Sequence, residues 1–229
     1  LRDQRRWLSH SYLQLIVADA PALAAQKLFH DHWRDMLEQP TIVSWPATVR
    51  YSAEYWKLFE SQLLDLVRFM RTDLATRYAF QAQWIDNFFR NLRFALLDPG
   101  ISSLIGLFRG KPAIIVSAGP SLEKNVHLLA EAKGKAVIIA AGSAINPVRK
   151  HGIEPDLLVS FDPTENNYRH FEDLDTPYLP LIYIPTIFPR ILEEYRGPRF
   201  TAAMDMFPFT SWLFAQLGED KGLLKTGPS

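Results

Sequence analysis

The chain contains no cysteine. This absence excludes a disulfide scaffold, a thiol nucleophile and a zinc site with cysteine ligands. It also suits a reducing compartment, and we expect the protein in the cytoplasm. Neither sign of charge is in excess, because 25 Lys and Arg residues balance 25 Asp and Glu residues. Such a chain lacks the overall basic excess typical of proteins that hold nucleic acid, so we expect no nucleic-acid partner.

Long hydrophobic runs are also missing. The apolar run at 136–141 is far shorter than the roughly 20 residues that a membrane-spanning helix needs. The apolar stretch 13–25 is interrupted by Gln14 and Asp19, and no signal-peptide cleavage pattern follows it. We therefore expect neither a membrane span nor an export signal. Since 48% of the 229 residues are hydrophobic, the chain can bury a core and is not disordered.

Glycine and proline are scarce in the first part of the chain. Residues 1–110 contain 3 Gly and 4 Pro, whereas residues 111–229 contain 8 Gly and 12 Pro. The first part also holds 17 of the aromatic residues and the second part 12. Few breakers favour long helices, and many breakers favour short elements joined by turns. The sequence thus predicts an N-terminal helical region over 1–110 and a second domain over 111–229.

The helical region shows two apolar stripes within 51–97, a segment without Gly or Pro. Their spacing is typical of a helix, but it leaves open whether there is one long helix or two with a break at 71–73. Earlier helices are expected over 5–19 and 22–38, and a short one over 102–108. The stripes consist of Tyr55, Phe59, Leu63, Leu66 and Met70, followed by Phe80, Trp84, Phe88 and Leu92.

The second part alternates between apolar runs and helical segments. Runs that are apolar throughout are typical of strands buried on both faces of a parallel sheet. One intervening helix carries Leu122, Val126 and Leu129 on one face, and the next is expected to start with Asn146 as its N-cap and Pro147 behind it. The fold class is therefore α/β, a Rossmann-like, mostly parallel sheet preceded by an aromatic-rich helical region. The expected strands are 113–116, 136–140, 157–161 and 181–184.

Ligands bind beyond the carboxyl ends of the strands in an open parallel sheet. Three segments occupy these positions, 117–122, 142–146 and 162–164. In the first, Gly119 lets the backbone approach a ligand, and Ser121 is expected to cap a helix whose N-terminus attracts phosphate. An ordinary strand-to-helix turn accounts for the same residues. Neither the dinucleotide fingerprint nor the P-loop motif is present.

Asp162 follows the third strand and precedes Pro163. Its carboxylate could hold a metal, a ribose hydroxyl or a substrate hydroxyl, or it could start a turn by accepting a bond from its own downstream backbone. His30 and His32 lie two positions apart, which puts them on different helix faces, so they are expected to be surface residues. Any metal would then be an oxygen-ligated ion such as magnesium. The aromatic segment 207–212 is expected to pack in the core.

Four sequence blocks, in order, resemble the MptE-like (DUF115) domain over roughly 98–229. They are Lys111–Leu122, Gly142–Pro147, Gly152–Asp156 and Ser160–Pro163. Two kinds of protein share this domain. One is the bacterial motility accessory factor (Maf) family of flagellin glycosyltransferases, and the other is an archaeal 6-hydroxymethyl-7,8-dihydropterin pyrophosphokinase that uses ATP and magnesium. The preceding aromatic helices make this chain most similar to the Maf proteins.

The resemblance implies a transferase that moves a nonulosonic sugar, of the pseudaminic or legionaminic type, from a CMP-sugar to Ser or Thr of flagellin. Asp162 would lie near the donor as the candidate catalytic residue, or would hold magnesium in a pyrophosphokinase. A third hypothesis is a non-catalytic flagellin-binding module. No cofactor is firmly implied for the sugar transferase besides its CMP-sugar donor. Its oligomeric state is left open, and a homo-oligomer is one possibility. The implied nucleotide-binding residues are Ser117, Ala118, Gly119, Pro120, Ser121, Leu122, Gly142, Ser143 and Asn146.

The resemblance departs from the family pattern at Ser117, where other members have Gly, and at Phe161, which replaces a smaller apolar residue. The end of the chain, 225–229, repeats the Gly-Pro-Ser of the first loop. In the family a second such segment opens a further helix and strand. We therefore expect a domain that is incomplete at Ser229 and inactive by itself, whereas a tail with a chance match is the alternative.

Overall fold

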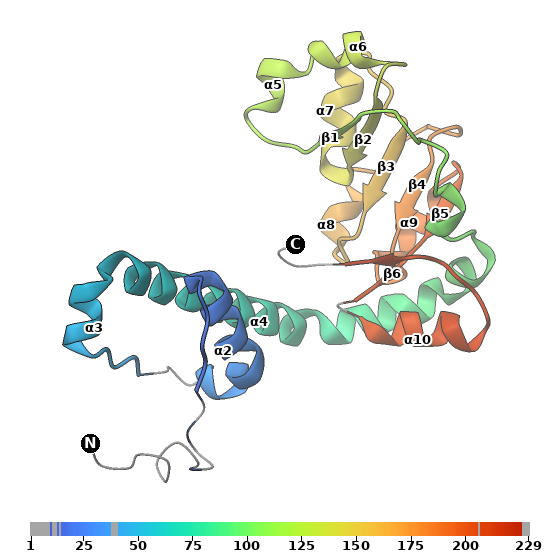
Figure 1. Cartoon of the computed structure of the whole chain (residues 1–229). Coiled ribbons are helices and arrows are strands. Elements are labelled where there is room, and N and C mark those ends of the chain that lie inside the picture. The colour runs from blue at the N-terminus through green and yellow to red at the C-terminus, as the bar shows by residue number, and fades with distance from the viewer. Residues whose placement is uncertain (1–9, 11–12, 14, 38–40, 206, 226–229) are drawn as a thin grey trace. The chain divides into compact units, whose positions relative to one another are not determined.

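The computed structural model describes residues 10, 13, 15–37, 41–205 and 207–225 (Figure 1). The chain forms two compact units, Leu1–Ala79 and Phe80–Ser229. Their boundary falls inside a long helix, so the predicted domain boundary at 110 lies within the second of these units and stays a prediction. The Gly-Pro-Ser at 227–229 lies outside the described residues.

The first unit is helical. It contains α2 (Pro21–Met36), α3 (Pro46–Tyr51) and the beginning of α4 (Ala53–Leu97). Pro21 starts α2, since a proline at the first helical position loses no hydrogen bond there. The helix expected over 5–19 is wrong where it can be checked, because residues 13 and 15–18 are not helical and most of the others lie outside the described residues.

The core of this unit joins α2 to the first apolar stripe of α4. Leu63 and Val67 are buried against Ala25 and Met36 of α2. The predicted packing of these helices among themselves is thus confirmed for the first stripe. Partly buried side chains complete the cluster, namely Leu28, Phe29, Phe59 and Leu66.

Helix α4 is one helix of 45 residues. The absence of Gly and Pro between its ends explains why no break occurs near residue 72, a point that the periodicity alone left open. In the second unit Phe88 of α4 is buried, while Phe80 and Trp84 stack with ring centroids 6.3 Å apart. Among the described residues, no helix combines the length and the apolar character needed to cross a membrane.

The second unit is built on a five-stranded parallel sheet in the order β1-β2-β3-β4-β5. The predicted α/β class and all four predicted strands are confirmed, with shifts of a residue at their ends. The fifth strand was not predicted, because it is short and begins with a charged residue. The strands are β1 (Ala113–Val116), β2 (Val137–Ala141), β3 (Leu157–Ser160), β4 (Leu181–Tyr183) and β5 (Arg199–Thr201); a separate pair consists of β6 (Ala203–Met204) and β7 (Leu223–Leu224).

Short helices connect these strands. The single helix expected after β1 is wrong, since α5 and α6 are separated at Val126 and His127. The expected N-cap at Asn146 is also wrong, because the chain already turns helically at Gly142 and Asn146 lies inside α7. The helical elements are η1 (Ile101–Leu104), α5 (Leu122–Asn125), α6 (Leu128–Ala132), η2 (Gly142–Ala144), α7 (Ile145–Lys150), α8 (Glu165–Tyr168), α9 (Pro189–Glu194) and α10 (Pro208–Gln216).

The sheet is buried mainly on one face. Ile138, Leu158 and Leu181 are 0% exposed, whereas Ile115 of β1 is 77% exposed. Right-handed crossovers between strands that follow one another in one direction place the connecting helices on the same face, which explains this difference. The expectation that every strand is buried on both faces is therefore wrong for the edge strand β1.

Tyr195 gives the folded state a measurable dependence on alkaline pH. Its ring is buried, and its hydroxyl donates to the Leu179 carbonyl at 2.6 Å. Burial raises the pKa of Tyr195 from its usual 10 to about 12. A group with a raised pKa contributes stability that is complete below pH 10 and is lost as the pH rises to about 12.

We expect wild-type protein to lose about 1.4 kcal/mol more stability than Tyr195→Phe between pH 8 and pH 11, which corresponds to one pKa unit of this window. Urea unfolding at the two pH values measures the difference. Tyr178→Phe is the matched control, because Tyr178 is 91% exposed and should give the same pH dependence as wild type. Equal pH dependence in wild type and Tyr195→Phe would contradict the assignment.

Candidate functional site

The three loops expected to bind a ligand lie at one edge of the sheet. The parallel register pairs Val116 with Ala140, and Ala141 with Val159. Strands β1, β2 and β3 therefore end next to one another, and Figure 1 shows their carboxyl ends pointing the same way. The structure thus brings the segments 117–122, 142–146 and 162–164 to the position where open α/β sheets bind ligands.

The first loop is open to solvent, with residues 117–121 all exposed. A Cβ added at Gly119 would have only the Ser121 Oγ within 4 Å, at 4.0 Å, so the fold itself does not require glycine there. The predicted cap is wrong, since Ser121 stands at the N-cap of α5 without a side-chain capping hydrogen bond. Because α5 has four residues, its dipole is small, and a phosphate at this loop would contact mainly the loop's own N–H groups.

The second loop is less accessible. Gly142 is buried, and a Cβ there would lie 2.8 Å from Ser160 Oγ. This glycine serves the packing of β2 against β3. The Asn146 amide donates to the His170 carbonyl at 3.3 Å, so it links α7 to the segment after α8. Ser143 is exposed at the same edge and remains the residue of this loop that faces solvent.

Asp162 starts a turn and is exposed as well. Its Oδ1 accepts hydrogen bonds from the Thr164 N–H at 2.8 Å and from Thr164 Oγ1 at 2.6 Å. The turn that the sequence offered as an alternative role is therefore present. These two bonds fix the carboxylate while leaving it at the surface, so a turn residue and a ligand-binding residue are compatible here.

A buried polar pair supports this loop from below. Asn167 is 6% exposed and donates through Nδ2 to the Asp162 carbonyl at 2.9 Å. Its Oδ1 accepts from Ser160 Oγ at 3.1 Å. The sequence alone does not reveal this pairing, because a Ser and an Asn seven residues apart carry no recognisable pattern.

Helix α4 supplies further residues that the sequence did not reveal. Gln83 and Asn87 both donate to the Pro163 carbonyl, at 2.8 and 2.9 Å, and Asn87 also donates to the Thr186 carbonyl at 2.9 Å. Asn91 donates to the carbonyls of Pro185 and Ile187 at 2.9 and 2.7 Å. The regular spacing of four residues was the available signal, but it was hidden beside the aromatic stripe.

Comparison with known proteins agrees with this architecture. A family model described as 6-hydroxymethylpterin diphosphokinase MptE-like matches residues 86–229. The chain belongs to the MptE-like family. The resemblance seen in the sequence is confirmed for the domain, while the special similarity to Maf proteins stays a prediction.

One relative of this MptE-like chain is an uncharacterized protein from Treponema pallidum (strain Nichols). It is 30% identical over 122 residues, which are 49% of this chain and 57% of the relative. The match thus spans little more than half of that relative. No solved structure matches the chain.

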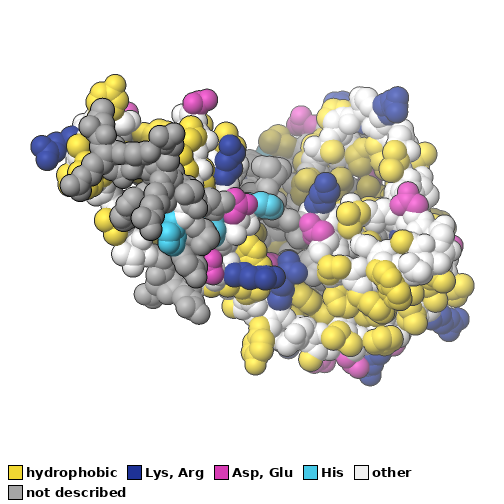
Figure 2. All heavy atoms as spheres, turned by 60° about the horizontal axis from the view of Figure 1, so that its bottom comes forward, with side chains coloured by type: hydrophobic (Ala, Val, Ile, Leu, Met, Phe, Trp, Pro, Cys, Tyr) yellow, Lys and Arg dark blue, Asp and Glu magenta, His cyan; other side chains and the backbone are white. Residues whose placement is uncertain are grey.

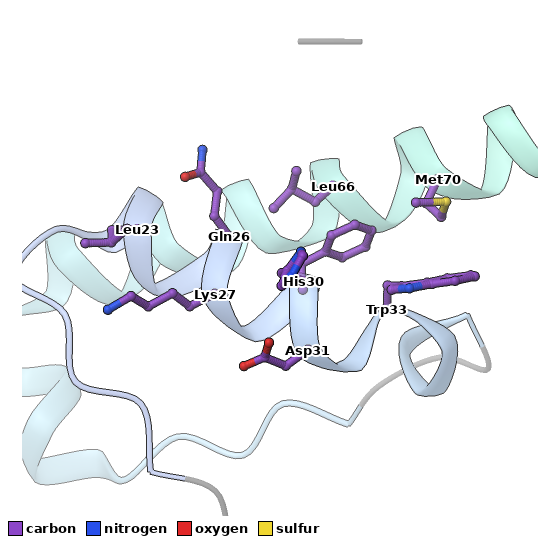
Figure 3. Close-up of a pocket in the computed structure, with 9 residues that line it drawn as sticks. Leu23, Gln26, Lys27, His30, Asp31, Trp33, Leu66 and Met70 are labelled. Atoms are coloured by element: carbon purple, nitrogen blue, oxygen red, sulfur yellow. The ribbon is translucent and has the colours of Figure 1, made fainter. Parts of the chain in front are cut away.

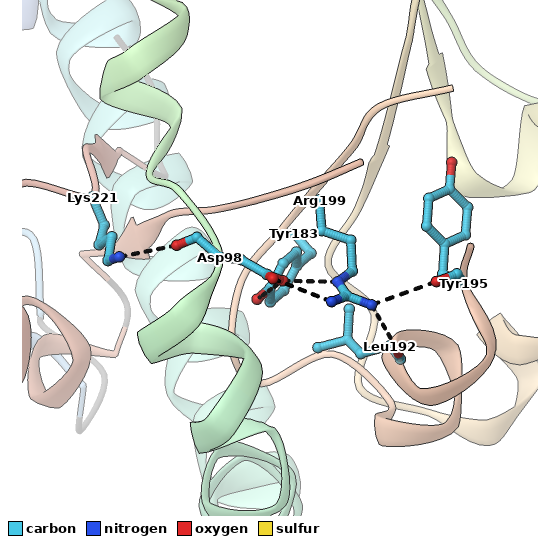
Figure 4. Close-up of polar contacts among 6 residues, drawn as sticks. All are labelled: Asp98, Tyr183, Leu192, Tyr195, Arg199 and Lys221. Carbon is cyan, nitrogen blue, oxygen red and sulfur yellow. Dashed lines mark hydrogen bonds and ion pairs between the residues drawn. The ribbon is translucent and has the colours of Figure 1, made fainter. Parts of the chain in front are cut away.

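A charge cluster of the MptE-like domain centres on Asp98 (Figure 4). Asp98 accepts from Arg199 Nε at 2.8 Å, from Arg199 Nη2 at 3.2 Å and from the Tyr183 hydroxyl at 2.9 Å. Burial, with the Asp98 charge beside it, raises the pKa of Tyr183 well above its usual range. Lys221 donates to the Asp98 carbonyl at 2.9 Å. These groups satisfy one another, so the cluster is structural.

The two larger of the cavities found among the described residues lie outside the loop edge. One, of about 630 Å³, lies between α2 and α4 in the first unit, and its lining includes Trp33, Leu66 and His30 (Figure 3). His32 instead pairs with Asp35 at 3.6 Å, so the two histidines do not form a ligand pair. The other, of about 680 Å³, has an acidic lining. Within the described part of the chain, no group of three or more His, Asp or Glu residues could hold a metal ion.

An aromatic patch covers part of α4 and α10. Phe209 stacks on Trp212 at 5.5 Å and meets buried Phe88 at 5.3 Å. Phe209 and Trp212 are nevertheless 40% and 55% exposed, so the expected core position is wrong for these two residues. Figure 2 shows hydrophobic side chains gathered on the surface that this view brings forward.

Proposed function

We propose that the carboxyl edge of this sheet binds a nucleotide-activated donor and is the donor site of a group transferase. The observation that carries the proposal is an exposed, fixed Asp162 carboxylate at the same carboxyl edge of the sheet as the glycine loop 117–122 and Ser143. The loop backbone would meet the donor phosphate, and stabilising charge on the departing phosphate is the main electrostatic task of such a transfer. Asp162 would accept a hydrogen bond from a donor or acceptor hydroxyl.

The leading form of this function is Maf-like. The donor is then a CMP-linked nonulosonic sugar, and the acceptor is a Ser or Thr hydroxyl of flagellin in the cytoplasm. The four sequence blocks and the aromatic-rich helices before them support this choice. The long α4, which runs into the domain from the first unit, is consistent with a helical region dedicated to the acceptor protein.

A second candidate is a pterin diphosphokinase, which the description of the matching family favours. Magnesium would be the implied ion. Asp162 offers an exposed carboxylate at the loop edge, and this fits, because magnesium is commonly held by one or two carboxylates together with substrate phosphates and water. The ion would supply charge neutralisation for phosphoryl transfer. Asp162 would hold it, with Thr164 keeping the carboxylate oriented.

Calorimetric titration of CMP, CDP and ATP into the chain, in magnesium and in EDTA, tests the proposal. We expect CMP to bind with an affinity that EDTA does not change, and Asp162→Ala to weaken it about tenfold. Asp175→Ala, which removes an exposed carboxylate from another loop, should bind like wild type. Strictly magnesium-dependent ATP binding that Asp162→Ala abolishes would favour the diphosphokinase. No binding of any of the three nucleotides would overturn the proposal in favour of a non-catalytic module.

A further inference from the structure

Three side-chain amides on one face of α4 form hydrogen bonds to the loops that follow β3 and β4 in the chain. Gln83, Asn87 and Asn91 are spaced by four residues, so their side chains point the same way. All three donate to backbone carbonyls, and their acceptors are Pro163, Thr186, Pro185 and Ile187. The helix thereby contacts both loops, which also meet each other where the Phe188 N–H donates to the Asp162 carbonyl at 3.4 Å.

The Pro163 carbonyl is the convergence point. It accepts from Gln83 Nε2 at 2.8 Å and from Asn87 Nδ2 at 2.9 Å, which uses both of its lone pairs. On the other side of the loop, the Asp162 carbonyl accepts from Asn167 Nδ2 at 2.9 Å. The peptide between Asp162 and Thr164 is therefore held from two directions, and the carboxylate that projects from it has a defined position.

Stability alone does not explain the choice of these side chains. Asn87 is 3% exposed and Asn91 is 0% exposed, and the Asn91 Oδ1 is buried without a hydrogen-bond partner. An exchange of water for carbonyl partners yields little net free energy, and an unsatisfied buried oxygen costs some. Buried amides of this kind instead specify one geometry, since a shifted loop would leave them unpaired.

We propose that Gln83 and Asn87 are positioning residues that fix the Asp162 carboxylate for the donor. This inference rests on the proposed function, because it concerns the same site. Neither amide touches the donor, and both act through the 162–164 loop. Helix α4, for which we propose contact with the acceptor, is then coupled to the loop proposed to hold the donor. A change in α4 is therefore expected to alter donor binding.

The test uses the full chain and compares Gln83→Ala with Gln81→Ala. Gln81 is an exposed glutamine two positions away on the same helix and serves as the matched control. We expect Gln83→Ala to raise the Kd for CMP about threefold to tenfold with little change in melting temperature, and Gln81→Ala to leave both unchanged. In an Asp162→Ala background, Gln83→Ala should have no further effect on the Kd, because its target is gone.

A second measurement reads the loop without any nucleotide. The Thr164 N–H donates to Asp162 Oδ1, so its hydrogen exchange reports how well the loop is held. We expect the Thr164 N–H to exchange about tenfold faster in Gln83→Ala and in Asn87→Ala than in wild type. In Gln81→Ala the exchange rate should not change. Unchanged exchange, or equal weakening of CMP binding with and without Asp162, would overturn the inference. Failure of wild type to bind CMP would count against the proposed function alone, since the exchange measurement still decides the positioning role.

Discussion

Replacing Asp98 with alanine is expected to lower the free energy of unfolding of the second unit by about 3 kcal/mol, as for a buried ion pair that loses one partner. The Asp98 side chain is 11% exposed and accepts two bonds from Arg199 and one from Tyr183. Without it, Arg199 keeps the carbonyls of Leu192 and Tyr195, at 3.1 and 3.4 Å, and the face of the Phe94 ring, 4.8 Å from its guanidinium carbon. The Tyr183 hydroxyl, in a residue that is 0% exposed, loses its acceptor.

Urea unfolding followed by tryptophan fluorescence measures this loss. Asp86→Ala is the matched control, because Asp86 lies on α4, the helix that ends just before Asp98, is 67% exposed and pairs with Arg90 at the longer distance of 3.7 Å. A surface pair of this kind contributes less than about 1 kcal/mol. The double variant Asp98→Ala/Arg199→Met should recover part of the loss, since it removes the uncompensated charge. A loss below about 1 kcal/mol for Asp98→Ala would show that the cluster does not hold β5 in the sheet.

The Asp98 cluster also explains why the fifth strand could not be predicted from the sequence. Strands β1 to β4 are continuous apolar runs, and a run of this kind predicts a buried strand without knowledge of its neighbours. Strand β5 begins with Arg199, which reads as a surface residue. Its place at the sheet depends on Asp98, which is 101 positions away in the chain. No local pattern contains that partner.

The candidate site divides in the same way. The loops could be predicted, because a ligand edge follows directly from where parallel strands end. The helix caps at Ser121 and Asn146 could not be predicted correctly. A cap depends on the φ and ψ angles of a single residue, and a helix can start a few positions from where the sequence indicates. The amides of Gln83 and Asn87 have their acceptors 76 to 99 positions away, and only the folded chain brings them together.

Gly119→Val is expected to weaken CMP binding by at least about a hundredfold without lowering the melting temperature. A backbone that must touch a phosphate tolerates no branched side chain, because the added methyl groups occupy the ligand's place. The fold gives no reason for a loss of stability, since a Cβ at position 119 meets nothing closer than Ser121 Oγ at 4.0 Å. A loss of CMP binding in this variant would therefore come from a lost contact with the ligand and not from a destabilised fold.

Gly142→Val is the contrasting variant at the same edge. Its Cβ would lie 2.8 Å from Ser160 Oγ and 3.4 Å from Asn167 Oδ1, so we expect it to lower the melting temperature and to disturb the support of Asp162. Calorimetric titration of CMP and thermal unfolding of both variants separate the two effects. A folded Gly119→Val protein that binds CMP like wild type would remove the loop 117–122 from the site. The donor would then have to be held by Ser143 and Asp162, on the side of the sheet edge away from β1.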